Sequence, residues 1–158
     1  GRKDERLGKG KDVAARVALA LVLAAVQTAE TVNAACIVAP TMSGRTVRLV
    51  SNLRPRVPIY AVTPSERVMR QQQIHWGVVP MLGDVQGDMP SVVDNARDAV
   101  VSKGLLRPGD VAVFTAGDRS TSPVVSKGPD GTESVAATNV MCVVQIREND
   151  TTKQKGGK

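Results

Sequence analysis

The sequence predicts an α/β fold: a three-layer α/β/α sandwich around a mainly parallel five-stranded sheet, with the last strand antiparallel at an edge. Apolar residues make up 42% of the 158 residues and aromatic residues only 2%, so small aliphatic side chains must fill the core, as they do where helices cover a parallel sheet. Strand-like and helix-like segments also alternate with short connections, which is typical of βαβ units with right-handed crossovers. The length allows one core, and we find no internal repeat.

The first predicted element is an apolar helix. The run Val17–Val26 is rich in Ala and Leu and continues to Thr31, and Asp12 is placed to cap its start. Its ten uninterrupted apolar residues are fewer than the roughly 20 that span a bilayer. The basic start before this run resembles a signal peptide, but the continuation of the helix favours a buried domain helix. The sequence therefore predicts no transmembrane segment.

The remaining elements follow from local patterns. Val47 and Val50 recur at helical spacing, Pro64 and Ser65 begin a further helix, and Gly104 ends another. The predicted strands are Cys36–Ala39, Val57–Val62, Gly77–Leu82, Asp110–Ala116 and Asn139–Arg147, and the helices between them are Arg45–Leu53, Pro64–His75 and Pro90–Lys103.

A long segment, Gly117–Thr138, separates the last two predicted strands. It is rich in Gly, Ser, Thr, Pro and Asp and has no sustained hydrophobic period. We predict a loop, and a loop of this length is either functional or poorly ordered.

Much of the net charge of +6 lies at the two ends of the chain. Residues 1–12 and residues 147–158 each contribute +2. We predict flexible basic tails over residues 1–10 and 148–158, flanking one domain over residues 11–147. The tails are either simply solvated or arms that contact nucleic acid, an anionic membrane or an acidic partner, and their spacing does not select among these. The shortage of aromatic residues argues against stacking platforms for single-stranded nucleic acid.

The loop Thr41–Thr46 leaves a predicted strand and opens a predicted helix. Such a loop presents unpaired backbone N–H groups at the positive end of the helix dipole, which favours an anion. Thr41, Ser43 and Thr46 add hydroxyl groups, Gly44 lets a phosphate approach the backbone, and Arg45 adds charge at the rim. The alternative is that Ser43 only caps the helix and Gly44 only eases the turn.

No residue pattern points to catalysis or to a metal. Cys36 and Cys142 lack metal-ligand spacing and lie in apolar segments, which is typical of reduced thiols in an intracellular protein, in the cytoplasm or in an organelle. The sequence has no Walker loop and no nucleophile elbow, and we predict no cofactor for this chain. We interpret His75 as a helix-end residue and Arg54 as a solvated turn residue.

The segment Ala34–Thr63, AACIVAPTMSGRTVRLVSNLRPRVPIYAVT, resembles the C-terminal domain of pyruvate kinase. That family carries a hydrophobic strand, a Thr-x-Ser-Gly-x-Thr/Ser loop, a helix similar to Arg48–Ser51, a turn similar to Arg54-Pro55, and a strand beginning Pro-Ile. The resemblance continues through His75–Pro80 and through KGLLRPGDVAVFTAG, which begins at Lys103. It covers about Lys11 to Ile146.

The resemblance implies a regulatory domain of a glycolytic enzyme that transfers phosphate from phosphoenolpyruvate to ADP. In that family the chemistry takes place in a separate barrel, which needs roughly 250 residues, so the resemblance implies that this chain is not an enzyme by itself and carries no catalytic residue. The family binds an allosteric sugar phosphate at the position of the 41–46 loop. One departure is Gly117–Thr138, because the corresponding loop of the family is short and Gly-rich and helps to enclose that effector.

Two functions from different classes stay open. The first is the regulatory and oligomerising domain of a pyruvate kinase, which binds a phosphorylated sugar or another anionic effector and assembles as a homo-oligomer. The second is a non-enzymatic subunit of a larger protein assembly, recruited through its basic tails and the 117–138 loop. A fold alone does not separate them, because one fold carries many functions.

Overall fold

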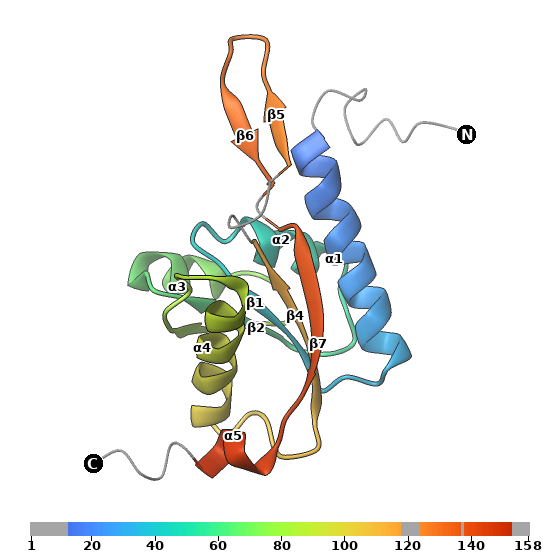
Figure 1. The fold of residues 1–158 in the computed structure, drawn as a ribbon, viewed down its shortest axis with the longest axis vertical. Helices are drawn as coiled ribbons and strands as arrows, with labels where there is room; N and C mark the ends of the chain where they lie inside the picture. Colours follow the sequence, from blue (N-terminus) through green and yellow to red (C-terminus); the bar gives the residue numbers. More distant parts are fainter. Residues whose placement is uncertain (1–12, 118–123, 137, 153–158) are drawn as a thin grey trace.

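The computed structural model describes residues 13–117, 124–136 and 138–152 (Figure 1). The helices are α1 (Val13–Thr31), α2 (Arg45–Asn52), α3 (Glu66–Gln72), α4 (Met89–Ser102) and α5 (Glu148–Thr152). The strands are β1 (Cys36–Pro40), β2 (Ile59–Thr63), β3 (Val78–Leu82), β4 (Val111–Ala116), β5 (Val125–Lys127), β6 (Glu133–Val135) and β7 (Val140–Gln145). The predicted helices and strands of the main domain are present, with ends that differ by up to three residues.

The main sheet has the strand order β3-β2-β1-β4-β7. β1, β2, β3 and β4 pair in parallel, and β7 runs antiparallel to β4 at the edge, with Phe114 opposite Cys142. This confirms the predicted α/β class and the antiparallel last strand. Because β2 and β3 lie on one side of β1 and β4 on the other, the chain changes direction between β1 and β4. Ligands of open α/β sheets bind beyond the carboxyl ends of the strands at such a position.

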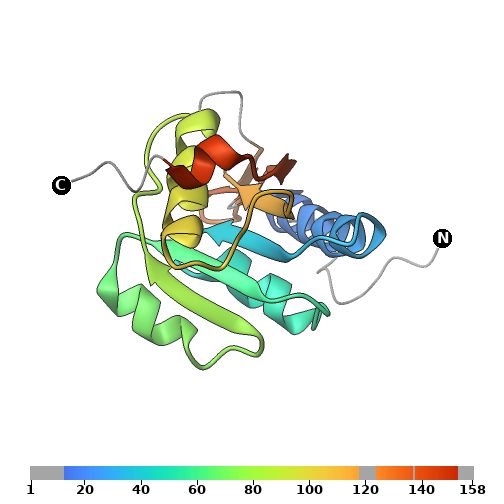
Figure 2. The same cartoon turned by 90° about the horizontal axis from the view of Figure 1, so that it is seen from below.

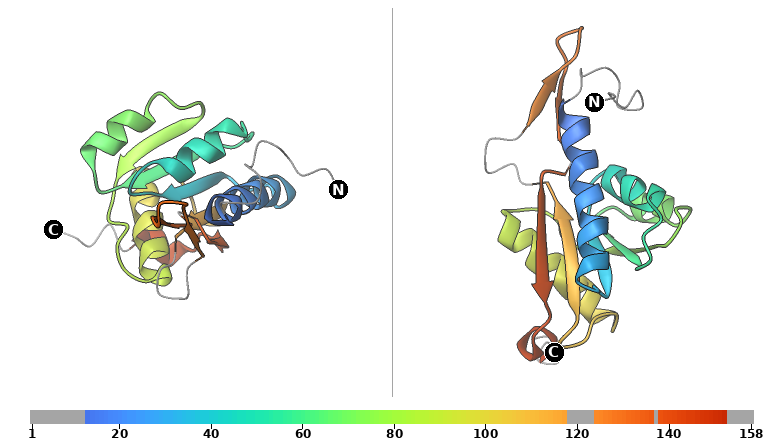
Figure 3. Two further views of the ribbon diagram at one scale, coloured as in Figure 1. Left: turned by 90° about the horizontal axis from the view of Figure 1, so that it is seen from above. Right: turned by 90° about the vertical axis from the view of Figure 1, so that its right-hand side faces the viewer.

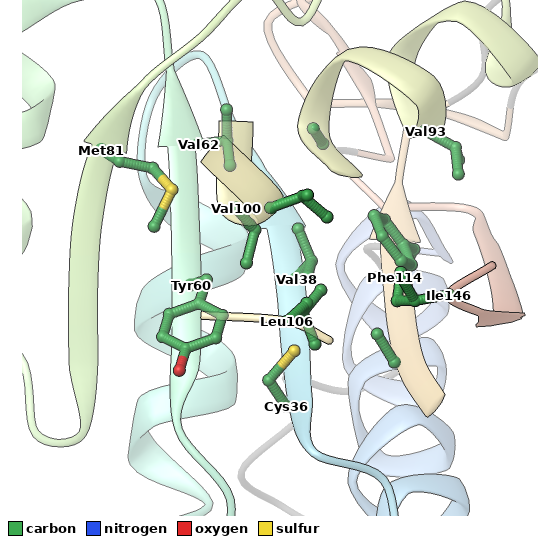
Figure 4. Close-up of a cluster of buried hydrophobic side chains, with 13 residues drawn as sticks. Cys36, Val38, Tyr60, Val62, Met81, Val93, Val100, Leu106, Phe114 and Ile146 are labelled. Carbon is green, nitrogen blue, oxygen red and sulfur yellow. The ribbon is translucent and has the colours of Figure 1, made fainter. Parts of the chain in front are cut away.

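Helices cover both faces of the sheet (Figures 2 and 3). α1, α2 and α3 lie on one face, and α4 and α5 on the other. Val22 of α1 and Val50 of α2 pack on Ile37 and Val113, all fully buried. On the opposite face Val100 of α4 packs with aliphatic side chains of the strands and with the single Phe and Tyr of the chain (Figure 4). Two small-residue cores therefore hold the sandwich together, as the composition predicts.

α1 is apolar on more than its buried side. It has the length and the mean hydropathy of a membrane-spanning helix, with 19 residues and a mean hydropathy of 1.6, and 28% of its apolar window is buried. Core helices of soluble proteins and signal sequences near the N-terminus meet the same criterion, so this alone is weak evidence for a membrane span. Five of its residues, Ala14, Ala18, Val22, Ala25 and Ala29, are buried at helical spacing. This packing agrees with the predicted domain helix. Asp12, the predicted cap, lies outside the described residues.

The prediction of a loop throughout Gly117–Thr138 is wrong in one part. β5 and β6 pair as an antiparallel hairpin, with Val125 opposite Val135, and the hairpin stands out from the domain beside the start of α1 (Figure 1). The turn is closed by the Gly128 N–H, which donates to the Thr132 carbonyl oxygen, and by Gly131 at φ +81°. Two largely exposed strands of three residues each are too short to produce a readable hydrophobic alternation.

The predicted tail at residues 148–158 is also corrected in part, because Glu148–Thr152 form α5. The Asp150 carboxylate accepts a hydrogen bond from the Arg147 N–H at 2.7 Å and pairs with the Arg97 side chain on α4 at 3.6 Å. An acidic residue in the first turn and a cation on the facing helix therefore order a segment that the polar composition places in a tail. The predicted tail at residues 1–10 and residues 153–158 lie outside the described residues.

Candidate functional site

A cleft of about 690 Å³ lies beyond the carboxyl ends of the strands, where the chain changes direction between β1 and β4. Four segments surround it: the β1–α2 loop, the β3–α4 loop with the first turns of α4, the end of β4, and the base of the β5–β6 hairpin. The residues that line it are Pro40, Thr41, Met42, Ser43, Arg45, Thr46, Val85, Gln86, Gly87, Val92, Ala116, Gly117, Val135 and Ala136.

The β1–α2 loop is shaped by its own hydroxyl groups. Gly44 is the N-cap of α2, with φ +85° and ψ 0°, and its N–H donates to the Thr41 hydroxyl at 2.8 Å. The Arg45 N–H donates to the Ser43 hydroxyl at 3.3 Å. The first backbone bond into the helix runs from the Arg48 N–H to the Gly44 carbonyl at 3.1 Å.

Two N–H groups at the start of α2 have no acceptor among the described residues. They belong to Thr46 and Val47, the second and third helical residues. The first turn of α2 contains no acidic side chain that would complement the positive end of its dipole. A helix start with free N–H groups and no carboxylate can accept an anion.

The predicted anion residues divide between two sides of this loop. Thr41, Ser43, Arg45 and Thr46 line the cleft. Gly44 does not line it, and a Cβ at this position would clash with Nε2 of the Gln72 side chain of α3. The glycine is therefore required by the left-handed turn and by the close approach of α3. The alternative prediction that Ser43 caps α2 is wrong, because Gly44 is the N-cap residue and no side chain caps the helix.

The two buried threonines of the loop are already engaged. Thr41 is 8% exposed and accepts the Gly44 hydrogen bond, and the hydroxyl of Thr46, 4% exposed, lies 2.5 Å from the Thr138 hydroxyl. The exposed polar side chains on this wall are Ser43 and Arg45, and Met42 beside them is exposed as well. Of the residues that line the cleft on this side, the donors that remain for a ligand are thus the Thr46 amide, the Ser43 hydroxyl and the Arg45 guanidinium.

The residues that line the opposite walls of the cleft were not predicted from the sequence. Val85, Gln86 and Gly87 come from the β3–α4 loop, and Val135 and Ala136 from the base of the hairpin. The β3–α4 loop follows the carboxyl end of a parallel strand, as the 41–46 loop does, and this shared edge is the signal that could have joined them. The hairpin base had no such signal, because its approach to the cleft depends on long-range packing.

A second, shallower cleft of about 530 Å³ lies on the other side of the β1–α2 loop, between α2 and α3. It is lined by Ser43, Gly44, Arg45, Arg48, Gln71, Gln72, Ile74 and His75. Near this end of α3, the Arg54 guanidinium lies 5.5 Å from the centre of the Trp76 ring, so Arg54 is more than a solvated turn residue.

The titratable groups of the core offer no other site. Burial, followed by the nearby Asp110 carboxylate, raises the pKa of the Cys36 thiol to about 12, and burial also raises the pKa of Cys142. Both thiols are therefore poor nucleophiles at neutral pH. Among the described residues, no group of His, Cys, Asp and Glu side chains could hold a metal ion.

Comparison with known proteins gives a family for residues 19–144. The sequence profile of the family "Pyruvate kinase, alpha/beta domain" matches residues 19–144. Pyruvate kinase 2 of Synechocystis sp. is 46% identical over 94 residues, which are 58% of this chain and 15% of that protein. Pyruvate kinase of Geobacillus stearothermophilus is 41% identical over 90 residues, 57% of this chain and 15% of that protein. Pyruvate kinase of Clostridium acetobutylicum is 38% identical over 85 residues, 54% of this chain and 18% of that protein.

The aligned part of this chain thus spans 15 to 18% of the length of these relatives. The described residues form one open α/β sheet with a hairpin and contain no closed barrel. The profile match covers the strands β1 to β4, the cleft between them and most of β7. With its strand order and its match over residues 19–144, the chain belongs to the pyruvate kinase α/β domain family.

Proposed function

We propose that this chain is the regulatory domain of a pyruvate kinase and binds a phosphorylated small molecule in the 690 Å³ cleft. The observation that carries the proposal is the start of α2, where the N–H groups of Thr46 and Val47 have no acceptor among the described residues, while Ser43, Arg45 and Thr46 line a cleft at the direction change of the sheet. Phosphate binds where several donors come together, and a helix start with a neighbouring hydroxyl and guanidinium group supports a ligand of this kind.

Electrostatics support the same ligand class. Arg45 adds a full positive charge beside the partial charge of the helix start, and the Ser43 hydroxyl adds a neutral donor. Both side chains are exposed and therefore accessible to a ligand. The affinity should fall as salt rises, because exposed charges are screened.

The test is the thermal stability of the 158-residue chain with increasing glucose 6-phosphate. A ligand that binds only the folded state raises stability in proportion to ln(1 + [L]/Kd). Arg45→Ala and Ser43→Asp should remove most of the gain. Arg48→Ala is the matched control, because Arg48 is an exposed arginine of the same helix that does not line the 690 Å³ cleft. An equal loss in Arg45→Ala and Arg48→Ala would reject the site.

Catalysis is assigned to other parts of a longer polypeptide. The relatives are pyruvate kinases, and this chain aligns with a minor share of their length. We therefore place phosphoryl transfer from phosphoenolpyruvate in a barrel outside these residues, in a cytoplasmic enzyme that assembles as a homo-oligomer. The oligomer is tested by measuring molar mass in solution, and a monomer at micromolar concentration would contradict self-association of this chain.

The hairpin favours the second candidate function, a non-enzymatic subunit of a larger assembly. β5 and β6 stand away from the domain, and Val125 is 41% exposed (Figure 1). Such a projection can reach a neighbouring protein. Replacing residues 125–135 with a short Gly-Ser linker should release this chain from co-purifying subunits if the hairpin holds it there. Unchanged co-purification would leave the regulatory function as the sole candidate.

A further inference from the structure

The two helices between β1 and β3, α2 and α3, belong to a strongly basic part of the domain. Residues 41–77 hold six arginines against one acidic residue, a net charge of +5, whereas residues 78–146 hold five Lys and Arg residues against eight acidic residues, a net charge of −3. A region that concentrates one sign of charge attracts partners of the opposite sign. The six arginines are all exposed, and they are Arg45, Arg48, Arg54, Arg56, Arg67 and Arg70.

The domain itself supplies little negative charge to these arginines. Among the described residues, only Arg70 of the six lies within ion-pair distance of a carboxylate, that of Glu66 at 3.7 Å. The two side chains of this pair are 64% and 69% exposed, so the pair is weak. The other five arginines have no carboxylate partner within the described domain, and their charge is available to a partner molecule.

The 530 Å³ cleft between α2 and α3 lies within this basic region. Arg45 and Arg48 of α2 line it and are neighbours on the helix surface, because they are three residues apart. Gln71 and Ile74 line it from the α3 side. Arg67 precedes Gln71 by four residues on α3, which places it on the same face of that helix. No acidic side chain is among the described lining residues.

A buried acceptor without a donor lies at the base of this cleft. Gln72 lines the cleft but is only 3% exposed, and its Oε1 has no hydrogen-bond partner among the described residues. The side-chain amide lies against Gly44, whose loop therefore packs on it without donating to that oxygen. An unpaired buried acceptor is unfavourable, and an N–H group of a bound molecule can supply the missing donor when the amide turns toward the cleft.

These features fit an extended acidic peptide. Alternate side chains of an extended chain are about 6.6 Å apart on one face, close to the about 5–6 Å that separates neighbouring Cβ atoms such as those of Arg45 and Arg48. Two carboxylates of the peptide can therefore each pair with one arginine. A peptide backbone carries an N–H group that can donate to Gln72, and Ile74, 84% exposed, offers an apolar contact to an aliphatic side chain.

The same cleft is poorly suited to nucleic acid. Single-stranded nucleic acids are held largely by bases stacked on aromatic rings. Phe, Tyr and Trp do not occur among the described lining residues. The nearby Trp76 ring already carries the Arg54 guanidinium, 5.5 Å from its centre.

We propose that the 530 Å³ cleft between α2 and α3 is a docking site for an extended acidic segment of a partner protein. Carboxylates of the segment pair with Arg45 and Arg48, whose planar guanidinium groups can bind them through two hydrogen bonds each. One backbone N–H donates to the Gln72 oxygen, and an aliphatic side chain packs on Ile74. Ser43 and Arg45 line both clefts of the domain, but Arg48 and Gln72 line only this one, so they separate it from the proposed phosphate site.

Fluorescence anisotropy of the 158-residue chain tests the site with a labelled octapeptide, Gly-Glu-Ser-Glu-Ser-Val-Ser-Gly, whose ends are blocked. Its two glutamates and its valine lie on one face of the extended chain. We expect it to bind at least tenfold more tightly than the same peptide with glutamine in place of both glutamates, and than the uridine trinucleotide UpUpU, which has the same charge. Equal binding of the glutamine peptide, or no binding of the acidic peptide, would overturn the inference. Trinucleotide binding that equals or exceeds that of the acidic peptide would overturn it in favour of nucleic acid.

Two variants test the cause. Arg48→Ala should lower the affinity for the acidic peptide at least fivefold, and its control is Arg107→Ala, an exposed arginine of the turn before β4 that lines neither cleft. Equal losses in these two variants would show general charge attraction and would overturn the site.

Gln72→Met keeps an unbranched side chain of similar length but removes the acceptor. It should lower the affinity for the acidic peptide at least threefold, while the melting temperature stays the same or rises, because an unpaired buried oxygen is lost. A folded Gln72→Met variant with unchanged peptide affinity would overturn the assigned role of this oxygen.

Discussion

The side-chain hydroxyls of Thr46 and Thr138 lie 2.5 Å apart in a buried hydrogen bond between residues 92 positions apart in the sequence. Thr46 is in the first turn of α2, and Thr138 follows the hairpin and leads into β7. Thr138 is 0% exposed. The bond therefore joins the proposed phosphate wall to the segment that returns from the hairpin.

Breaking this pair should destabilise the fold. Thr138→Val leaves the Thr46 hydroxyl buried without its partner, and we expect a loss of about 1–3 kcal/mol in the free energy of unfolding, measured with urea. Thr115→Val is the matched control. The Thr115 hydroxyl is buried with no partner among the described residues, so a methyl group there should be neutral or stabilising. Equal losses in the two variants would show that packing, and not the hydrogen bond, dominates at Thr138.

Gly44→Ala should be more damaging than an alanine at another glycine with the same backbone. Gly44 has φ +85° and a Cβ there would clash with Gln72, whereas Gly109 has φ +91° and nothing within 4 Å. Both variants meet the left-handed cost of about 1–2 kcal/mol, and only Gly44→Ala adds the clash. Urea unfolding should rank Gly44→Ala well below Gly109→Ala. Adding Gln72→Ala to Gly44→Ala should recover part of the difference, and strict additivity would contradict the contact.

The main sheet could be predicted because each of its elements carries its own signal. Ile59–Thr63 is a continuous buried run, and Val92, Val93, Ala96 and Val100 recur at helical spacing toward the core. The antiparallel direction of β7 agrees with the absence of a predicted helix between it and β4, because parallel neighbours need a crossover connection that is usually a helix. The hairpin and α5 carry weak local signals, and their positions depend on contacts such as the Ala14 N–H with the Ser126 hydroxyl at 2.8 Å.

The candidate site was predictable on one wall only. The 41–46 loop has recognisable turn and hydroxyl residues, and four of the five expected residues line the cleft. Sequence alone could not show that Gly44 faces Gln72, because their contact joins separate helices. Sequence alone also could not show that the Asp88 carboxylate already accepts a hydrogen bond from the first turn of α4. An aspartate before a helix either caps the helix or stays available to a ligand, and the local sequence is the same in both cases.

The contact between Arg97 and Asp150 should decide whether α5 stays on α4. Both side chains are largely buried, at 15% and 14% exposed, and Asp98, the other carboxylate near Arg97 Nε, is 48% exposed. Asp150→Asn should cost about 1–2 kcal/mol of unfolding free energy and increase amide exchange in α5, because it also weakens the bond to the Arg147 N–H. Asp98→Asn should change stability by less than about 0.5 kcal/mol. The reverse order would show that α5 is held by other contacts.

Stability at alkaline pH should report the buried thiol of Cys36. Its pKa is raised from 9.0 to about 12 by burial and by Asp110, so between these values the unfolded chain ionises while the folded chain does not. The contribution of the protonated Cys36 thiol to the stability of the folded state is full below pH 9 and is lost as the pH rises toward 12. The difference in unfolding free energy between the native sequence and Cys36→Ala should therefore shrink by about 1.4 kcal/mol per pH unit above pH 9. The same difference measured for Cys142→Ala, at a partly exposed position, should change less with pH. If the difference for Cys36→Ala stays constant between pH 9 and 10.5, the Cys36 thiol ionises in the folded chain as it does in the unfolded chain.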